Sequence, residues 1–134
     1  MANPSALAMT INTPEVVREV RAAFDRYERA LNDNDIATLN ELIWDSPHTV
    51  RYGQGANLYG HAAIAGFRAA RDASDVKREL LRVEICAFGH DFATASCEYR
   101  RIVSGRRGRQ MQTWVRRPEG WRIVAAHVSF EGEK

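Results

Sequence analysis

The chain has 134 residues, of which 45% are hydrophobic and 27% are charged, and its formal net charge is +2. This length fits one domain, and the composition is that of an ordinary globular protein. A net charge this small does not by itself argue for a nucleic-acid partner, and no run approaches the roughly twenty apolar residues that span a bilayer.

The first predicted helix begins after a flexible N-terminal extension over residues 1–12. Thr13 suits the cap, Pro14 the first turn, and Glu15 complements the positive end of the helix dipole. Apolar side chains then recur at helical spacing, namely Val20, Phe24, Tyr27 and Leu31. We expect this helix to end around residues 32–34, and the whole domain to span residues 13–131.

Three short elements are predicted next. A second helix runs over residues 36–43 with Asp35 as its cap. Residues 49–53 and 57–60 are rich in strand formers and pair across a glycine turn. A third helix covers residues 61–71 and places Ile64 and Phe67 toward the core.

From residue 77 the hydrophobic period changes from 3.6 to 2. Four strands are predicted, over residues 77–88, 92–104, 109–117 and 121–130. Glycine-containing turns separate them, so the strands should form an antiparallel meander. Helices followed by strands indicate an α+β fold.

The two cysteines are predicted to be free thiols. A hairpin that turns near His90 places Cys86 opposite residue 94, not opposite Cys97, so the geometry disfavours a disulfide. Free thiols, together with an N-terminus that lacks a signal-peptide pattern, indicate a cytoplasmic protein.

Two surface features concern partners. Both faces of the last strand are largely apolar, although a solvated sheet face should be polar, so we expect a homodimer through the face that the helices leave open. Eight arginines lie in the last third of the chain. We favour solvated strand edges and turns over a nucleic-acid patch as their explanation.

Familiar catalytic signatures are missing. The sequence has no phosphate-binding glycine loop, nucleophile elbow or zinc-protease motif, and its four histidines show no ligand spacing. We therefore expect no metal or organic cofactor. A Cys–His nucleophilic pair stays open, but a buried structural cysteine explains each thiol better.

Polar groups within apolar patterns are the remaining candidates. From the pattern alone, Tyr27 fits a core tyrosine and Arg51 fits a solvent-facing strand arginine somewhat better than they fit functional groups. If Arg51 instead points inward, its guanidinium needs a partner, and a bound carboxylate is a good one. The other candidate pocket residues, each with an ordinary structural explanation, are Trp44, Arg68, His127 and Ser129.

The order of elements resembles the cone-shaped fold of the nuclear transport factor two-like superfamily, which includes SnoaL-like cyclases. Three N-terminal helices pack there on a curved, mostly antiparallel sheet. Residues 42–53, 57–60 and 66–71, with their VRYG and FRAAR blocks, are more narrowly similar to the AtzH-like family. That family includes the decarboxylating amidohydrolase of cyanuric acid breakdown and HpxZ-like proteins of oxalurate catabolism.

The resemblance implies a catalytic pair. The family's first-helix tyrosine and VRYG arginine correspond to Tyr27 and Arg51, and the implied substrate is a small carboxylated urea such as dicarboxyurea, converted to allophanate. Arginine matches a carboxylate in a two-pronged geometry. We expect Arg51 to orient the carboxylate and Tyr27 to handle the proton, unless Arg51 lowers the tyrosine pKa enough to change its role.

Two other functions stay open. The protein could hold a small carboxylate without turnover, or dock on an amidase of an oxalurate-type pathway. It could also catalyse another reaction on the same fold, such as isomerisation, which usually calls for a pocket carboxylate. Glu98 is the main candidate for such a base.

Overall fold

The computed structural model describes residues 9–132. Its helices precede the long strands, as predicted, and their bounds are α2 (Pro14–Asn32), α3 (Ile36–Leu42) and α4 (His61–Ala70). The strands are β1 (Val50–Gly53), β2 (Ala56–Tyr59), β3 (Arg78–Phe88), β4 (Phe92–Arg101), β5 (Arg107–Arg117) and β6 (Gly120–Phe130).

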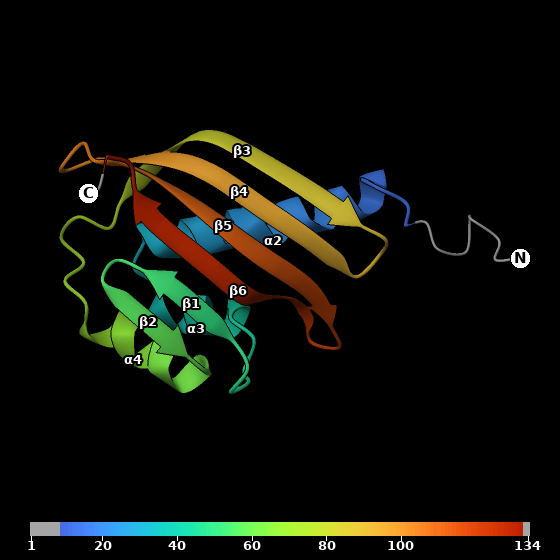
Figure 1. The fold of residues 1–134 in the computed structure, drawn as a ribbon, viewed down its shortest axis with the longest axis horizontal. Helices are drawn as coiled ribbons and strands as arrows, with labels where there is room; N and C mark the ends of the chain where they lie inside the picture. The colour runs from blue at the N-terminus through green and yellow to red at the C-terminus, as the bar shows by residue number, and fades with distance from the viewer. Residues whose placement is uncertain (1–8, 133–134) are drawn as a thin grey trace, which may run out of the picture.

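The six strands form one sheet in the order β2-β1-β6-β5-β4-β3. Neighbouring strands are antiparallel except β1 and β6, which run parallel. The helices lie behind the sheet on one of its faces (Figure 1). The predicted α+β fold and the meander from β3 to β6 are therefore confirmed.

The core lies between the helices and the inner sheet face. Its fully buried side chains come from both layers and include Phe24, Leu39, Ile64, Trp114 and Ile123. The hairpin register pairs Cys86 with Thr94 and Cys97 with Gln110, so both cysteines are free, as predicted.

The predicted N-terminal extension lies partly outside the described residues. Its last part is held against the edge of β3, where the Asn12 amide donates to the Ala87 carbonyl at 2.9 Å. The Asn12 side-chain oxygen accepts from the Ala87 amide at 2.8 Å. Residues 10–12 therefore cover a strand edge that would otherwise present free backbone groups.

One irregularity in β6 changes which residues face the core. Thr113 pairs with Ala125 but Trp114 pairs with Ile123, so Val124 is an extra residue in β6. The side-chain alternation shifts by one across such a bulge. Trp121 and Ile123 point inward before it, and Ala126, Val128 and Phe130 point inward after it.

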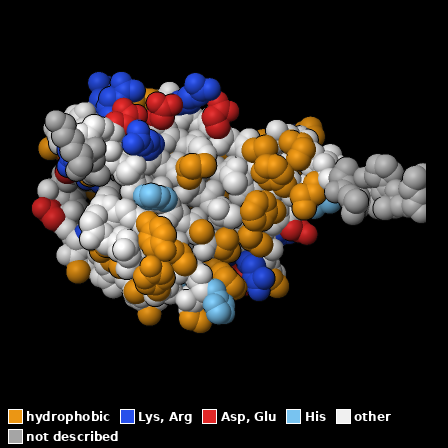
Figure 2. All heavy atoms as spheres, viewed as in Figure 1, with side chains coloured by type: hydrophobic (Ala, Val, Ile, Leu, Met, Phe, Trp, Pro, Cys, Tyr) orange, Lys and Arg blue, Asp and Glu red, His pale blue; other side chains and the backbone are white. Residues whose placement is uncertain are grey.

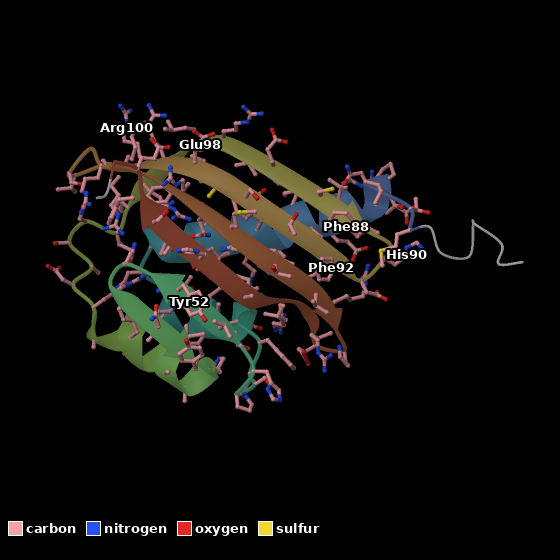
Figure 3. The ribbon with its side chains drawn as sticks, in the orientation of Figure 1. Tyr52, Phe88, His90, Phe92, Glu98 and Arg100 are labelled. Atoms are coloured by element: carbon pink, nitrogen blue, oxygen red, sulfur yellow. The ribbon has the colours of Figure 1, made fainter. Side chains whose placement is uncertain are left out.

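The outer sheet face carries exposed apolar side chains. Met111 is 62% exposed, Tyr59 61%, Phe92 40% and Tyr52 38%. Figure 2, which views this face, shows hydrophobic side chains gathered across it, and Figure 3 shows Tyr52 and Phe92 on it. Among residues 9–132, no helix is both long and apolar enough to cross a bilayer.

Candidate functional site

Tyr27 reaches the interior from α2. The buried stripe of this helix repeats every three to four residues, so Tyr27 lies one turn beyond Phe24 and is only 4% exposed. Its ring is therefore part of the core, while its hydroxyl lies at one edge of a cavity.

Arg51 points inward, as the family resemblance implied, although the strand pattern alone had favoured a solvent-facing side chain. Strand alternation places Val50 and Tyr52 on the outer face and Arg51 on the inner face, where it is 6% exposed. Its guanidinium lies 5.2 Å from the centre of the Phe67 ring. Among the described residues, its buried Nη1 has no hydrogen-bond acceptor.

Arg68 joins the two predicted catalytic residues. It lies one turn beyond Ile64 on α4 and is only 2% exposed, so it reaches the interior and does not lie at a solvated rim. Its Nη2 donates a hydrogen bond of 2.8 Å to the Tyr27 hydroxyl oxygen. That oxygen is an acceptor here, which leaves the hydroxyl proton free to be donated elsewhere.

Charge around Tyr27 makes its hydroxyl more acidic than usual. Burial alone raises the pKa of Tyr27, but the charges of Arg68 and Arg51 and the Arg68 hydrogen bond outweigh burial. The result is a pKa lowered from its ordinary value of 10.0. Tyr27 is therefore a better proton donor than a free tyrosine, and its phenolate is stabilised in place.

The cavity is small in the ligand-free structure, with a volume of about 20 Å³, which is room for about one water molecule. Helix α2, strands β1, β3, β4, β5 and β6, the turn between β1 and β2, and the segment that joins α4 to β3 supply its walls. Its lining residues are Tyr27, Leu31, Arg51, Gln54, Arg71, Val76, Arg78, Arg101, Gln110 and Val128.

One of these arginines is already neutralised. Arg78 Nε and Nη2 donate to the two carboxylate oxygens of Glu28 at 2.7 and 2.9 Å. Glu28 outweighs the effect of burial and raises the pKa of Arg78 above its usual value. Arg78 Nη1 donates to Gln110 Oε1 at 3.3 Å, and its guanidinium lies 4.4 Å from the centre of the Tyr99 ring. This pair fixes one wall of the cavity.

The structure places Trp44, His127 and Ser129 outside this cavity. Trp44 borders a separate groove of about 360 Å³, and the centre of its ring lies 5.3 Å from the Arg117 guanidinium. His127 is exposed beside Tyr52 on the outer face. Ser129 lies on that face too, at the limit of hydrogen bonding with Arg109. The bulge at Val124 turns His127 and Ser129 away from the sheet face of Trp121, so neither of these two candidate pocket residues reaches the cavity.

Glu98 also lies on the outer face, between the buried Cys97 and Tyr99 (Figure 3). No aspartate or glutamate is among the described residues that line the cavity. The described residues also contain no group of three or more His, Cys, Asp or Glu side chains able to hold a metal. The polar groups available to a ligand are therefore mostly donors.

Sequence reasoning missed several cavity residues, among them Arg71, Arg101 and Gln110. Arg71, the first residue after α4, follows Arg68 by three positions, and this spacing was a usable signal. Arg101 was assigned to a solvated strand edge, although it alternates in phase with Tyr99. Gln110 carried no signal beyond the alternation of its strand.

Comparison with known proteins matches the whole described domain to one family. The model of the AtzH-like family matches residues 9–134. A search of curated proteins finds no significant match.

Several solved structures are also similar to this chain. A protein of unknown function from Pectobacterium atrosepticum is 53% identical, with 91% of this chain and 95% of that chain covered and a TM-score of 0.88. A cystatin-like fold protein from Burkholderia xenovorans is 45% identical, with coverage of 95% and 100% and a TM-score of 0.88. A nuclear transport factor 2-like superfamily protein from Salmonella enterica is 25% identical, covers 91% and 95%, and has a TM-score of 0.73.

Proposed function

This chain belongs to the AtzH-like family, and we propose that it is a cofactor-independent decarboxylating amidohydrolase of nitrogen-compound catabolism. Its substrate in this proposal is a small carboxylated urea or amide such as dicarboxyurea. The fold is one in which small-molecule enzymes occur. The observation that carries the proposal is the Tyr27 hydroxyl, held by Arg68 at the edge of a cavity into which Arg51 points with an unpaired donor.

The proposed reaction breaks the bond between a carboxyl carbon and a urea nitrogen. The electron pair stays on nitrogen, carbon dioxide leaves, and nitrogen takes one proton. For dicarboxyurea the dianion and one water give the allophanate anion and bicarbonate. Tyr27 supplies the proton, and its phenolate is held by Arg68 until water returns a proton. Arg51 binds a carboxylate and holds the substrate against Tyr27.

Turnover is the test of this proposal. Purified protein should release carbon dioxide from dicarboxyurea, measured by a coupled bicarbonate assay. Arg51→Met should lower kcat/KM by at least 100-fold, because the carboxylate loses a charge-assisted contact and its orientation. The control is Arg82→Met, an exposed arginine whose side chain is 68% accessible. Absence of turnover with dicarboxyurea would contradict the proposal.

Binding without turnover would support the second candidate, a carboxylate-binding or amidase-accessory protein. The same unpaired donors would also bind a carboxylate in a protein without catalytic activity. Only the turnover assay therefore separates the two functions. An isomerase that uses a carboxylate base has less support, because no carboxylate lines the described part of the cavity. Cytoplasmic location belongs to the proposal and is supported by the two free thiols.

The outer sheet face supports a further part of the proposal, a homodimer. Exposed Met111, Tyr52 and Phe92 lie on this face, and Glu98 pairs in register with Arg82 on one side and Arg109 on the other. A self-complementary interface needs such a mixture of apolar and oppositely charged groups.

We expect sedimentation at micromolar concentration to give about twice the chain mass of 15.1 kDa. Met111→Asp should shift the protein toward monomer, because it places a charge on the apolar face. The matched control is Val103→Asp, an equally exposed apolar residue in the turn between β4 and β5. A wild-type monomer would contradict the dimer.

A further inference from the structure

Several residues that line the cavity carry buried hydrogen-bond donors without an acceptor. Among residues 9–132, no acceptor lies within hydrogen-bond distance of five buried nitrogens on its walls. They are Arg51 Nη1, Arg71 Nε, Arg71 Nη2, Arg101 Nε and Gln110 Nε2. Buried donors without acceptors are costly, so a protein rarely gathers several of them unless a ligand supplies the acceptors.

Positive charge also exceeds negative charge around the cavity. Five guanidinium groups surround it, from Arg68 behind Tyr27 and from the four arginines of the wall. Two carboxylates accompany them: Glu28 pairs with Arg78, and Asp75 lies 3.7 Å from Arg101. Within the described chain, the remaining three arginines have no carboxylate within 4.0 Å, so three positive charges are uncompensated.

Arg71 is the clearest case of a positive charge that no contact within the described chain explains. Burial, reinforced by the neighbouring charge of Arg68, lowers the pKa of Arg71 to about 10. A cation at the end of a helix often binds the last carbonyl groups, and Arg71 follows the last residue of α4. Here, however, Nε and Nη2 are buried and unpaired beside the cavity, so that explanation does not account for them.

We propose that Arg71 and Arg101 form a second carboxylate subsite in this cavity, so that the bound substrate is a dianion with two carboxylates on a short planar spacer. Arg51 binds the carboxylate nearer Tyr27, and the Gln110 amide donates to a polar atom of the spacer. Two of the uncompensated charges then match the dianion. The third stabilises the phenolate that forms when Tyr27 gives up its proton.

This inference rests on the proposed function, which supplies the location of the site. The second subsite can nevertheless be tested with ligands that bind but do not react. The probes are malonate, with two carboxylates, and acetate, with one, titrated by calorimetry at constant ionic strength. Wild-type protein should bind malonate at least tenfold more tightly than acetate, because two charge-assisted contacts replace one. Arg71→Met should reduce that ratio to about one while acetate still binds through Arg51.

Arg101→Met is the second variant and should show the same loss of the malonate preference. Arg82→Met, which removes an equal charge from the exposed outer face, should keep the wild-type ratio. Arg71→Met should also raise the Tm of the ligand-free protein, because it removes an uncompensated buried charge. A merely structural arginine would lower the Tm on substitution.

Each result points one way. Malonate binding no tighter than acetate, or an unchanged ratio in Arg71→Met, would overturn the second subsite. Loss of the ratio in that variant supports it, even if dicarboxyurea is not turned over and the proposed reaction is wrong. If dicarboxyurea is turned over but the malonate-to-acetate affinity ratio is unaltered in Arg71→Met, the proposed reaction would be supported and the second subsite overturned.

Discussion

Tyr27→Phe is expected to lower kcat for carbon dioxide release by about 10²- to 10⁴-fold, the usual contribution of a positioned proton donor. Malonate affinity should change little, because the ring still fills its place in the core and Arg51 is untouched. The variant removes one oxygen that accepts a hydrogen bond from Arg68. A stopped assay for bicarbonate and a malonate titration measure the two effects separately.

The pH dependence of activity gives the second signature of Tyr27. The proton donor must be protonated, so kcat should fall as pH rises through the Tyr27 pKa. Because that pKa is lowered from 10.0, the fall should begin below pH 10. Arg68→Met removes a cation and a hydrogen-bond donor, so it should raise the pKa and move the fall to higher pH. Tyrosinate absorbance near 295 nm should follow the same shift.

Tyr52→Phe is the matched control for both measurements. Tyr52 lies on the outer face, where its hydroxyl is 3.2 Å from that of Tyr59. The substitution should leave kcat and the pH profile unchanged. Wild-type activity in Tyr27→Phe would remove the tyrosine from the mechanism and leave carboxylate binding as the function of the cavity.

Glu28→Gln is expected to lower the free energy of unfolding by about 3–5 kcal/mol, the usual effect of breaking a buried ion pair on one side. The Glu28 side chain is 10% exposed and that of Arg78 is 4% exposed, so water cannot replace the lost charge. Arg78 would then join the uncompensated arginines around the cavity. Urea unfolding followed by circular dichroism measures the change.

The same helix offers an exposed pair as a control. Arg21 and Asp25 form an ion pair of 3.1 Å with side chains 51% and 47% exposed. Asp25→Asn should change the free energy of unfolding by less than about 0.5 kcal/mol. Equal effects of Glu28→Gln and Asp25→Asn would show that the buried pair contributes no more than a surface contact.

The fold was predictable because its signals are local. Periods of 3.6 and 2 separate helices from strands, and glycine turns separate the strands. The same alternation decides Arg51: Val50 and Tyr52 share the outer face, so Arg51 faces inward. Periodicity could not decide which of the two faces of this strand packs against the core. The family resemblance was needed for that step.

The bulge in β6 was not predictable in the same way. Val124 is apolar and continues the strand pattern, so nothing in the sequence distinguishes it as the extra residue. One extra residue moves each later side chain of the strand to the opposite face of the sheet. For that reason His127 and Ser129 were assigned to the core side. Arg101 was missed for a different reason. Its neighbour Arg100 is solvent-exposed, and both arginines were assigned to the same solvated strand edge.

With the proposed dianion as ligand, the uncompensated guanidinium groups would couple the lifetime of this protein in the cell to the concentration of that ligand. A ligand that binds the folded chain and not the unfolded chain adds stability of RT ln(1 + [L]/Kd), about 2.7 kcal/mol at 100 times Kd. In a cell, proteases act mainly on the open form, so a filled cavity would lengthen the protein's lifetime and an empty one would shorten it. Abundance would then rise and fall with supply of the dianion, without any dedicated regulator.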